Sequence, residues 1–290
     1  IAAWCAYRGL TVTLQDRGAE YVQPALERAR EFFAKRARGA EAAAEAMSRL
    51  TADVEGRGVP QADVVIEAIY ENVEAKQALY ARLVPQMKPA AVLATNTSSL
   101  MLETLAAALP DPARLVGLHF FNPVAVMPLI EVVKVPSTNE ETLATAMEVA
   151  KKLGKNAVIT ADRPGFVVNR LLAKVMGEAA RALDEGTPAG TVEKAYAPIG
   201  LPMGPFELID LVGWKVAAHV QDTMAGAFPE RFYASENLHR LAEISRDTLA
   251  LERHGEPYAA LAPDAAAAVD AGVSGLLKEN RYDAAAGTPR

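Results

Sequence analysis

The chain has 290 residues, of which 51% are hydrophobic and 23% are charged, and its formal net charge is -6. This length is enough for two domains with buried cores, and the negative charge argues against general nucleic-acid binding. No run of about 18 uncharged apolar residues occurs, so we expect no membrane span. The single cysteine, Cys5, excludes an internal disulfide, fits a reducing compartment and is interpreted as a small core residue.

The first part of the chain alternates apolar runs with segments of helical periodicity. The expected strands cover 10–14, 62–68, 90–94, 115–118, 129–135 and 156–160, and the expected helices cover 19–37, 40–50, 72–84, 100–108 and 139–153. This alternation predicts a largely parallel, doubly wound α/β sheet, in which ligands bind beyond the carboxyl ends of the strands. The polar residues at or close to those ends are Asp16, Glu71, Asn96, Ser98 and His119.

The pattern becomes helical after residue 162. The segment 161–165 contains Pro164 and Gly165 and marks the expected boundary. A long amphipathic helix is expected over 166–184, and further helical segments follow it. We therefore expect an α/β domain over 1–162, an all-α domain over 163–262, and the start of a further helical segment over 263–290, with a helix at about 264–280.

His119 follows an expected strand and is flanked by Phe120 and Phe121, which can exclude water from one side of it. A lone histidine in such a place is commonly a structural residue. Glu131, however, interrupts the apolar run 129–133, and a carboxylate buried there requires a partner. An imidazole is a suitable partner, and the pair would form a general base oriented by an acid. The alternative is an edge-strand carboxylate that faces water, and the spacing alone does not decide between the two.

Five sequence blocks resemble those of L-3-hydroxyacyl-CoA dehydrogenases, in the family's order and with similar spacing. They are VIEAIYENVEAK (65–76), LATNTSSL (93–100), GLHFFNPVAVMPLIEVV (117–133), PGFVVNR (164–170) and LPMGPFELID (201–210). The resemblance implies a Rossmann-type sheet followed by an all-α C-terminal domain. It also implies NAD-dependent oxidation of (S)-3-hydroxyacyl-CoA to 3-oxoacyl-CoA in fatty-acid β-oxidation.

The resemblance implies catalytic roles for four residues. His119 would take the proton of the substrate 3-hydroxyl, and Glu131 would hold the imidazole and stabilise its cation. Ser98 would bind near the 3-oxygen and the nicotinamide, and Asn169 would bind the substrate carbonyl oxygen. These roles agree with what hydride transfer needs, namely a base, dipoles that hold the oxygen, and exclusion of water.

The resemblance also implies cofactor contacts. Asp16 would bind the adenosine ribose, and its carboxylate would repel a 2′-phosphate, which favours NAD over NADP. The other expected cofactor positions are Glu71, Lys76, Asn96, Ser98 and Asn122. For Glu71 and Lys76 the alternative is a surface salt bridge at the start of a helix. No metal site is expected.

A basic stretch covers 28–38 and contains Arg28, Arg30, Lys35, Arg36 and Arg38. Without other information it reads as a solvated helix face. The resemblance places the helix after the first expected strand near the CoA nucleotide, so Arg30, Lys35 or Arg38 would meet CoA phosphates.

The sequence departs from the family pattern at its start. The glycine loop G-x-G-x-x-G and the strand ahead of it do not occur, and residues 1–9 resemble only the helix that follows that loop. We therefore expect a sheet without a central strand, with unpaired edges beside the gap, and we expect cofactor binding to depend on sequence ahead of Ile1. The region 212–232 resembles bacterial multifunctional fatty-acid oxidation proteins, so the chain is interpreted as a middle piece of such a protein.

Two other functions remain open from the sequence. One is a short-chain 3-hydroxybutyryl-CoA dehydrogenase, and the other is a catalytically inactive binding or structural relative, or an inactive fragment. The expected partners are an acyl-CoA substrate and either further copies of the chain or the other parts of a multifunctional β-oxidation complex. The expected location is the cytoplasm.

Overall fold

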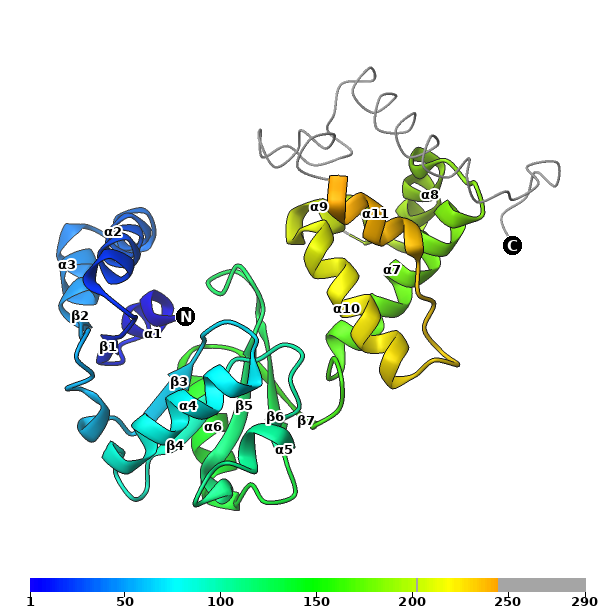
Figure 1. The fold of residues 1–290 in the computed structure, drawn as a ribbon. Coiled ribbons are helices and arrows are strands. Elements are labelled where there is room, and N and C mark those ends of the chain that lie inside the picture. The colour runs from blue at the N-terminus through cyan, green and yellow to red at the C-terminus, as the bar shows by residue number, and fades with distance from the viewer. Residues whose placement is uncertain (202, 245–290) are drawn as a thin grey trace. The chain divides into compact units, whose positions relative to one another are not determined.

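The computed structural model describes residues 1–201 and 203–244. The chain forms two compact units that divide between Phe166 and Val167. The first unit is α/β and the described part of the second is helical (Figure 1), which confirms the expected fold class. The helix expected at about 264–280 and the segment 263–290 lie outside the described residues.

The first unit contains a two-stranded parallel sheet and a five-stranded sheet. Their strands are β1 (Val12–Leu14) and β2 (Leu50–Ala52), then β3 (Val64–Glu67), β4 (Val92–Thr95), β5 (Leu115–Phe120), β6 (Leu129–Lys134) and β7 (Asn156–Ala161), in that spatial order within each sheet. The β5–β6 pair is antiparallel and the other pairs are parallel. Within the described residues, β1 pairs only with β2 and β3 only with β4, so each keeps an unpaired edge, as expected for a sheet that lacks a central strand.

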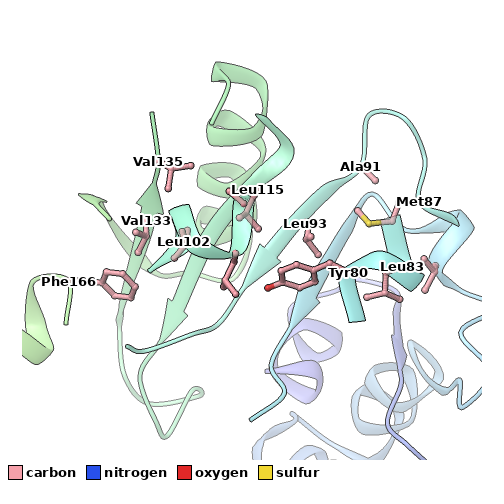
Figure 2. Close-up of a cluster of buried hydrophobic side chains, with 13 residues drawn as sticks. Tyr80, Leu83, Met87, Ala91, Leu93, Leu102, Leu115, Val133, Val135 and Phe166 are labelled. Atoms are coloured by element: carbon pink, nitrogen blue, oxygen red, sulfur yellow. The ribbon is translucent and has the colours of Figure 1, made fainter. Parts of the chain in front are cut away.

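Helices cover both faces of the five-stranded sheet. The helices of the first unit are α1 (Ala2–Tyr7), α2 (Ala19–Arg36), α3 (Ala40–Ser48), α4 (Val73–Leu83), α5 (Leu102–Ala106) and α6 (Glu140–Lys152). Tyr80 of α4 and Leu102 of α5 pack with Leu93 and Leu115 on one face (Figure 2). On the other face, α1 and α6 pack against Leu118 and neighbouring strand residues. Alternate strand residues therefore contribute to separate cores.

Two elements differ from the expectation for a local reason. The expected helix 40–50 ends at Ser48, and the three-residue strand β2 follows at once, too short to show a periodicity of its own. The expected helix 166–184 begins at Val168, because Gly165 (φ 69°) and Phe166 (φ 45°) occupy the left-handed region, which a helix cannot include.

The second unit packs its helices around an apolar core. They are α7 (Val168–Asp184), α8 (Ala189–Tyr196), α9 (Pro205–Val212), α10 (Trp214–Ala227) and α11 (Glu236–Ile244). Phe206, Trp214 and Leu238 belong to this core. None of the helices in the described residues combines the length and the apolar character that crossing a bilayer requires.

Candidate active site

The antiparallel pairing of β5 and β6 brings His119 directly opposite Glu131. Directly opposite residues point to the same face of a sheet, and Nδ1 of His119 lies 2.7 Å from Oε2 of Glu131. The side chains are 6% and 1% exposed, respectively. The interpretation of Glu131 as a carboxylate that faces water is therefore wrong, because the imidazole partners it. His119 also lies inside β5, one residue before its end, and not beyond the strand as expected.

Two aromatic rings lie beside the imidazole. The ring centroid of Phe121 is 4.6 Å from that of His119, and the ring centroid of Phe166 is 5.6 Å from it. The sequence had suggested Phe120 as one of the two flanking rings. Phe120 instead packs in the core beneath α1 and α6, because neighbouring strand residues face opposite sides of the sheet. The rings of Phe121 and Phe166 make the surroundings of the imidazole apolar.

The loop after β4 is tied to the strands on both sides of it. Oδ1 of Asn96 accepts a hydrogen bond from the backbone N–H of Phe120 at 3.0 Å, and the N–H of Asn96 donates to the carbonyl of Glu67 at 2.8 Å. Asn96 thus connects β3, β4 and β5 at their carboxyl ends. The segment 97–100 follows directly, so it starts beside the strand that carries His119.

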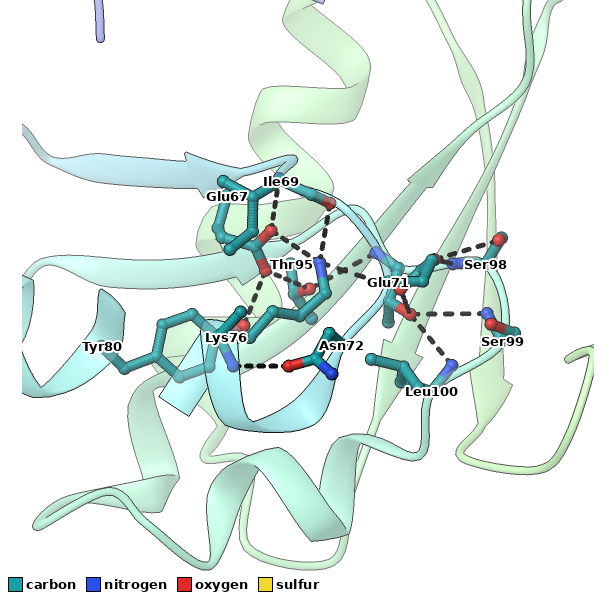
Figure 3. Close-up of polar contacts among 12 residues, drawn as sticks. Glu67, Ile69, Glu71, Asn72, Lys76, Tyr80, Thr95, Ser98, Ser99 and Leu100 are labelled. Carbon is teal, nitrogen blue, oxygen red and sulfur yellow. Dashed lines mark hydrogen bonds and ion pairs between the residues drawn. The ribbon is translucent and has the colours of Figure 1, made fainter. Parts of the chain in front are cut away.

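Glu71 holds this loop from the β3–α4 connection (Figure 3). Its Oε1 accepts from the backbone N–H of Ser98 at 2.7 Å and from Oγ of Ser98 at 3.1 Å. Its Oε2 accepts from Oγ1 of Thr97 at 2.8 Å. Glu71 and Ser98, both expected at the site, are therefore in direct contact.

Lys76 is buried, so its interpretation as one half of a surface salt bridge is wrong. Its Nζ lies 2.6 Å from Oε1 of Glu67 and 3.8 Å from Oε2 of Glu71. The sequence does not predict Glu67 as a site residue, because it stands within the apolar run 62–68. The signal was nevertheless present, since a carboxylate at the end of such a run needs a buried partner, as Glu131 does.

The remaining expected residues lie at the surface or in the second unit. Asp16 follows β1, its side chain is 51% exposed, and it accepts from the N–H of Arg17 at 2.7 Å. Asn122 is exposed in the loop between β5 and β6. Asn169 lies in the first turn of α7 and is partly buried. The basic residues of α2 and of the turn after it are exposed, as a solvated face would be: Arg28, Arg30, Lys35, Arg36 and Arg38.

Several of the residues expected at the site therefore lie at or just after the carboxyl ends of β1, β3, β4 and β5. They are Asp16, Glu71, Asn96, Ser98 and His119. An exposed carboxylate at Asp16 suits the hydroxyls of a ribose, and Ser98 carries a hydroxyl on the loop after β4, which pairs with the strand that carries His119. Groups of these kinds suit the polar parts of a dinucleotide. No group of three or more metal-ligating side chains occurs in the described residues.

Comparisons with known proteins identify both units. The family description "3-hydroxyacyl-CoA dehydrogenase, NAD binding domain" matches residues 1–163, and "3-hydroxyacyl-CoA dehydrogenase, C-terminal domain" matches residues 165–253. The fatty acid oxidation complex subunit alpha of Pseudomonas entomophila is 37% identical over 235 residues, which are 80% of this chain and 33% of the relative. The chain therefore spans about a third of the length of that curated relative.

Two solved structures resemble the chain across both units. FadB2 of M. tuberculosis is 33% identical with a TM-score of 0.80, and the match covers 84% of this chain and 89% of that one. The 3-hydroxybutyryl-CoA dehydrogenase of Escherichia coli is 36% identical with a TM-score of 0.79, and the match covers 84% of this chain and 54% of that one. The chain belongs to the 3-hydroxyacyl-CoA dehydrogenase family, and its first unit is an NAD-binding domain of that family.

Proposed function

We propose that the protein oxidises (S)-3-hydroxyacyl-CoA to 3-oxoacyl-CoA with NAD, as a step of fatty-acid β-oxidation. The observation that supports this most directly is the buried contact between His119 and Glu131 at the carboxyl edge of the sheet. NAD, when bound, supplies the acceptor for the hydride that leaves the substrate carbon.

His119 acts as the general base in this proposal. Its Nδ1 contacts Glu131, so Nε2 is the ring nitrogen that takes the proton of the 3-hydroxyl. The Glu131 carboxylate holds the ring in one orientation and stabilises the imidazolium that forms. Phe121 and Phe166 exclude water from the imidazole, which strengthens its interaction with the carboxylate.

The other residues bind and orient the two reactants. Ser98 binds the 3-oxygen next to the nicotinamide, and Asn169 binds the carbonyl oxygen of the acyl group. Asp16 binds the adenosine ribose and disfavours a 2′-phosphate. The remaining cofactor positions in this proposal are Glu71, Asn96 and Asn122, and Lys76, whose side chain is 1% exposed, acts on the cofactor only through Glu71.

The exposed cations of α2, Arg30 and Lys35 among them, bind the phosphates of CoA in this proposal. The relative from Pseudomonas entomophila is named as a subunit of a complex, which supports assembly of this protein with copies of itself or with other β-oxidation enzymes. We place this activity in the cytoplasm, and cell fractionation tests that part of the proposal.

A short-chain substrate is the second candidate. The similarity to the 3-hydroxybutyryl-CoA dehydrogenase of Escherichia coli favours it. Rates measured with 3-hydroxyacyl-CoA substrates of increasing chain length separate the two. A kcat/KM that is highest at four carbons and falls with length supports the short-chain enzyme.

The variant His119→Gln tests the proposed reaction. Gln keeps a polar side chain in the strand but cannot serve as the base, so turnover should fall by about a hundredfold or more while NAD affinity, measured by binding, stays the same. Turnover close to that of the unchanged protein would refute the assignment of the base. No turnover by the unchanged protein, with any chain length, would favour the inactive binding or structural relative.

A further inference from the structure

Glu67 lies at the end of β3 and has no role in the proposed function, and its carboxylate accepts hydrogen bonds from four donors. Oε1 accepts from the N–H of Ile69 at 2.7 Å and from Nζ of Lys76 at 2.6 Å. Oε2 accepts from the hydroxyls of Tyr80 and Thr95, each at 2.8 Å. Burial raises the pKa of the Tyr80 hydroxyl, and the nearby charge of Glu67 raises it further. Four donors therefore satisfy the hydrogen-bonding capacity of this buried carboxylate.

The Lys76 ammonium lies between two carboxylates at unequal distances. It makes a hydrogen bond to Oε1 of Glu67 at 2.6 Å and another to the carbonyl of Ile69 at 3.2 Å, whereas Oε2 of Glu71 lies at 3.8 Å. The Glu67 and Lys76 side chains are 0% and 1% exposed, and that of Glu71 is 31% exposed. The buried carboxylate therefore takes the short contact, and the outer one takes a longer, weaker contact.

This division leaves the Glu71 oxygens to the loop after β4. The three donors from Thr97 and Ser98 described above all reach Glu71. Thr97 in turn accepts from the N–H of Leu100 at 3.0 Å. A continuous chain of contacts thus runs from Glu67 through Lys76 and Glu71 to the segment that carries Ser98 (Figure 3).

We propose that Glu67 is a positioning residue for Ser98: by binding the Lys76 ammonium closely, it prevents that ammonium from drawing Glu71 away from the 97–98 loop. A buried ammonium that loses one anionic partner is strongly attracted to the next. Without the Glu67 charge, the nearest remaining anion is Glu71, and the two need only close a 3.8 Å separation to pair directly. The Glu71 carboxylate would then give up hydrogen bonds to Ser98.

The variants Glu67→Gln and Glu67→Gln with Lys76→Met separate a charge effect from a packing effect. Gln keeps the shape, and its amide can bond to the Tyr80 and Thr95 hydroxyls, which rotate to accept. The double variant removes both charges, and a buried ion pair is often replaced by neutral residues of similar size without loss of stability. Tyr80→Phe is the matched control, since it removes one hydrogen bond of Glu67 and leaves the ion pair in place.

Amide hydrogen exchange of the Ser98 N–H measures the loop directly and does not depend on turnover. We expect exchange about tenfold faster in Glu67→Gln, the equivalent of one lost hydrogen bond. Exchange should return close to the original rate in the double variant and stay unchanged in Tyr80→Phe. If Glu67→Gln does not fold, the double variant still decides, because a folded double variant with a slowly exchanging Ser98 supports the inference. Unchanged exchange in a folded Glu67→Gln, or fast exchange in the double variant, would overturn it.

The effect on catalysis rests on the proposed function. We expect kcat/KM to fall about tenfold in Glu67→Gln and to recover in the double variant, in parallel with the exchange rates. A residue that only stabilised the fold would not show recovery on removal of a second buried group. Absence of turnover in the unchanged protein would refute the proposed function alone, since the exchange experiment decides the role of Glu67 by itself.

Discussion

The variant Glu131→Gln tests whether the pair of Glu131 and His119 serves catalysis or only stabilises the fold. The substitution keeps the side-chain shape and an oxygen that can accept from Nδ1 of His119, but it removes the charge. The contact is 2.7 Å long and the carboxylate is 1% exposed, so solvent screens it little. A hydrogen bond to a charged group contributes roughly 1.5–3 kcal/mol, and Coulomb attraction at about 4 Å with an effective dielectric constant of about 20 gives about 4 kcal/mol.

These energies act only after His119 has taken the proton, because a neutral imidazole gains little from the carboxylate charge. The loss therefore belongs to kcat, which should fall by about 10-fold to 1,000-fold, while KM changes little. Steady-state rates of NAD reduction with a 3-hydroxyacyl-CoA substrate measure both constants. Glu148→Gln, at an exposed position of α6, is the control and should keep the original rate. A kcat within twofold of the original in a folded Glu131→Gln protein would refute the reasoning.

Two further substitutions and one labelling experiment test other parts of the structure. Asp16→Asn should raise the KM for NAD about tenfold, which corresponds to the loss of one charge-assisted hydrogen bond. It should also lower the ratio of kcat/KM for NAD to kcat/KM for NADP. Burial raises the pKa of the Cys5 thiol to about 11, so a thiol reagent at neutral pH should label it only after denaturation. Burial also raises the pKa of Asp210 from 3.8 to about 6, so the folded state keeps this proton longer and loses stability as pH rises across that interval. Asp210→Asn, which keeps an acceptor for Trp214, should therefore gain about 2 kcal/mol of unfolding free energy at about pH 7 and nothing below about pH 3.

A specific result would contradict each of these three predictions. An unchanged ratio of kcat/KM for NAD and NADP would remove Asp16 from the cofactor site. Rapid labelling of Cys5 in the folded protein would contradict its burial. Equal denaturation midpoints for Asp210→Asn and the unchanged protein at both pH values would show that Asp210 is fully hydrated.

The sequence predicted most of the strands and the pair at the centre of the site. Apolar runs bounded by polar residues were sufficient for β3, β4 and β6, since the interior of a sheet covered on both faces selects such runs, and an apolar run also predicted β7, although that strand is largely exposed. The argument that a carboxylate inside an apolar run needs a partner made the contact of Glu131 with His119 one of two open interpretations, and the family resemblance favoured it. The same argument applied to Glu67 would have found its pairing with Lys76, but that carboxylate stands at the end of a run, where a polar residue is expected anyway.

What the sequence could not predict depends on contacts between distant segments. β2 has three residues and forms only because β1 pairs with it. The positive φ of Phe166, which moves the start of α7 and brings its ring to His119, has no local sign in a residue type that rarely adopts it. Phe166 takes the place expected for Phe120 beside the imidazole for the same reason, since this requires the segment after β7 to lie against the face of the sheet that carries His119.

The antiparallel register of β5 and β6 also bears on how this site can vary among related chains. The separation between base and acid is set by backbone hydrogen bonds of the ladder, and the connecting loop 121–128 does not determine it. That loop can therefore lengthen, shorten or change composition without moving the two groups apart. A single residue inserted within either strand, by contrast, would turn one of the pair to the opposite face of the sheet.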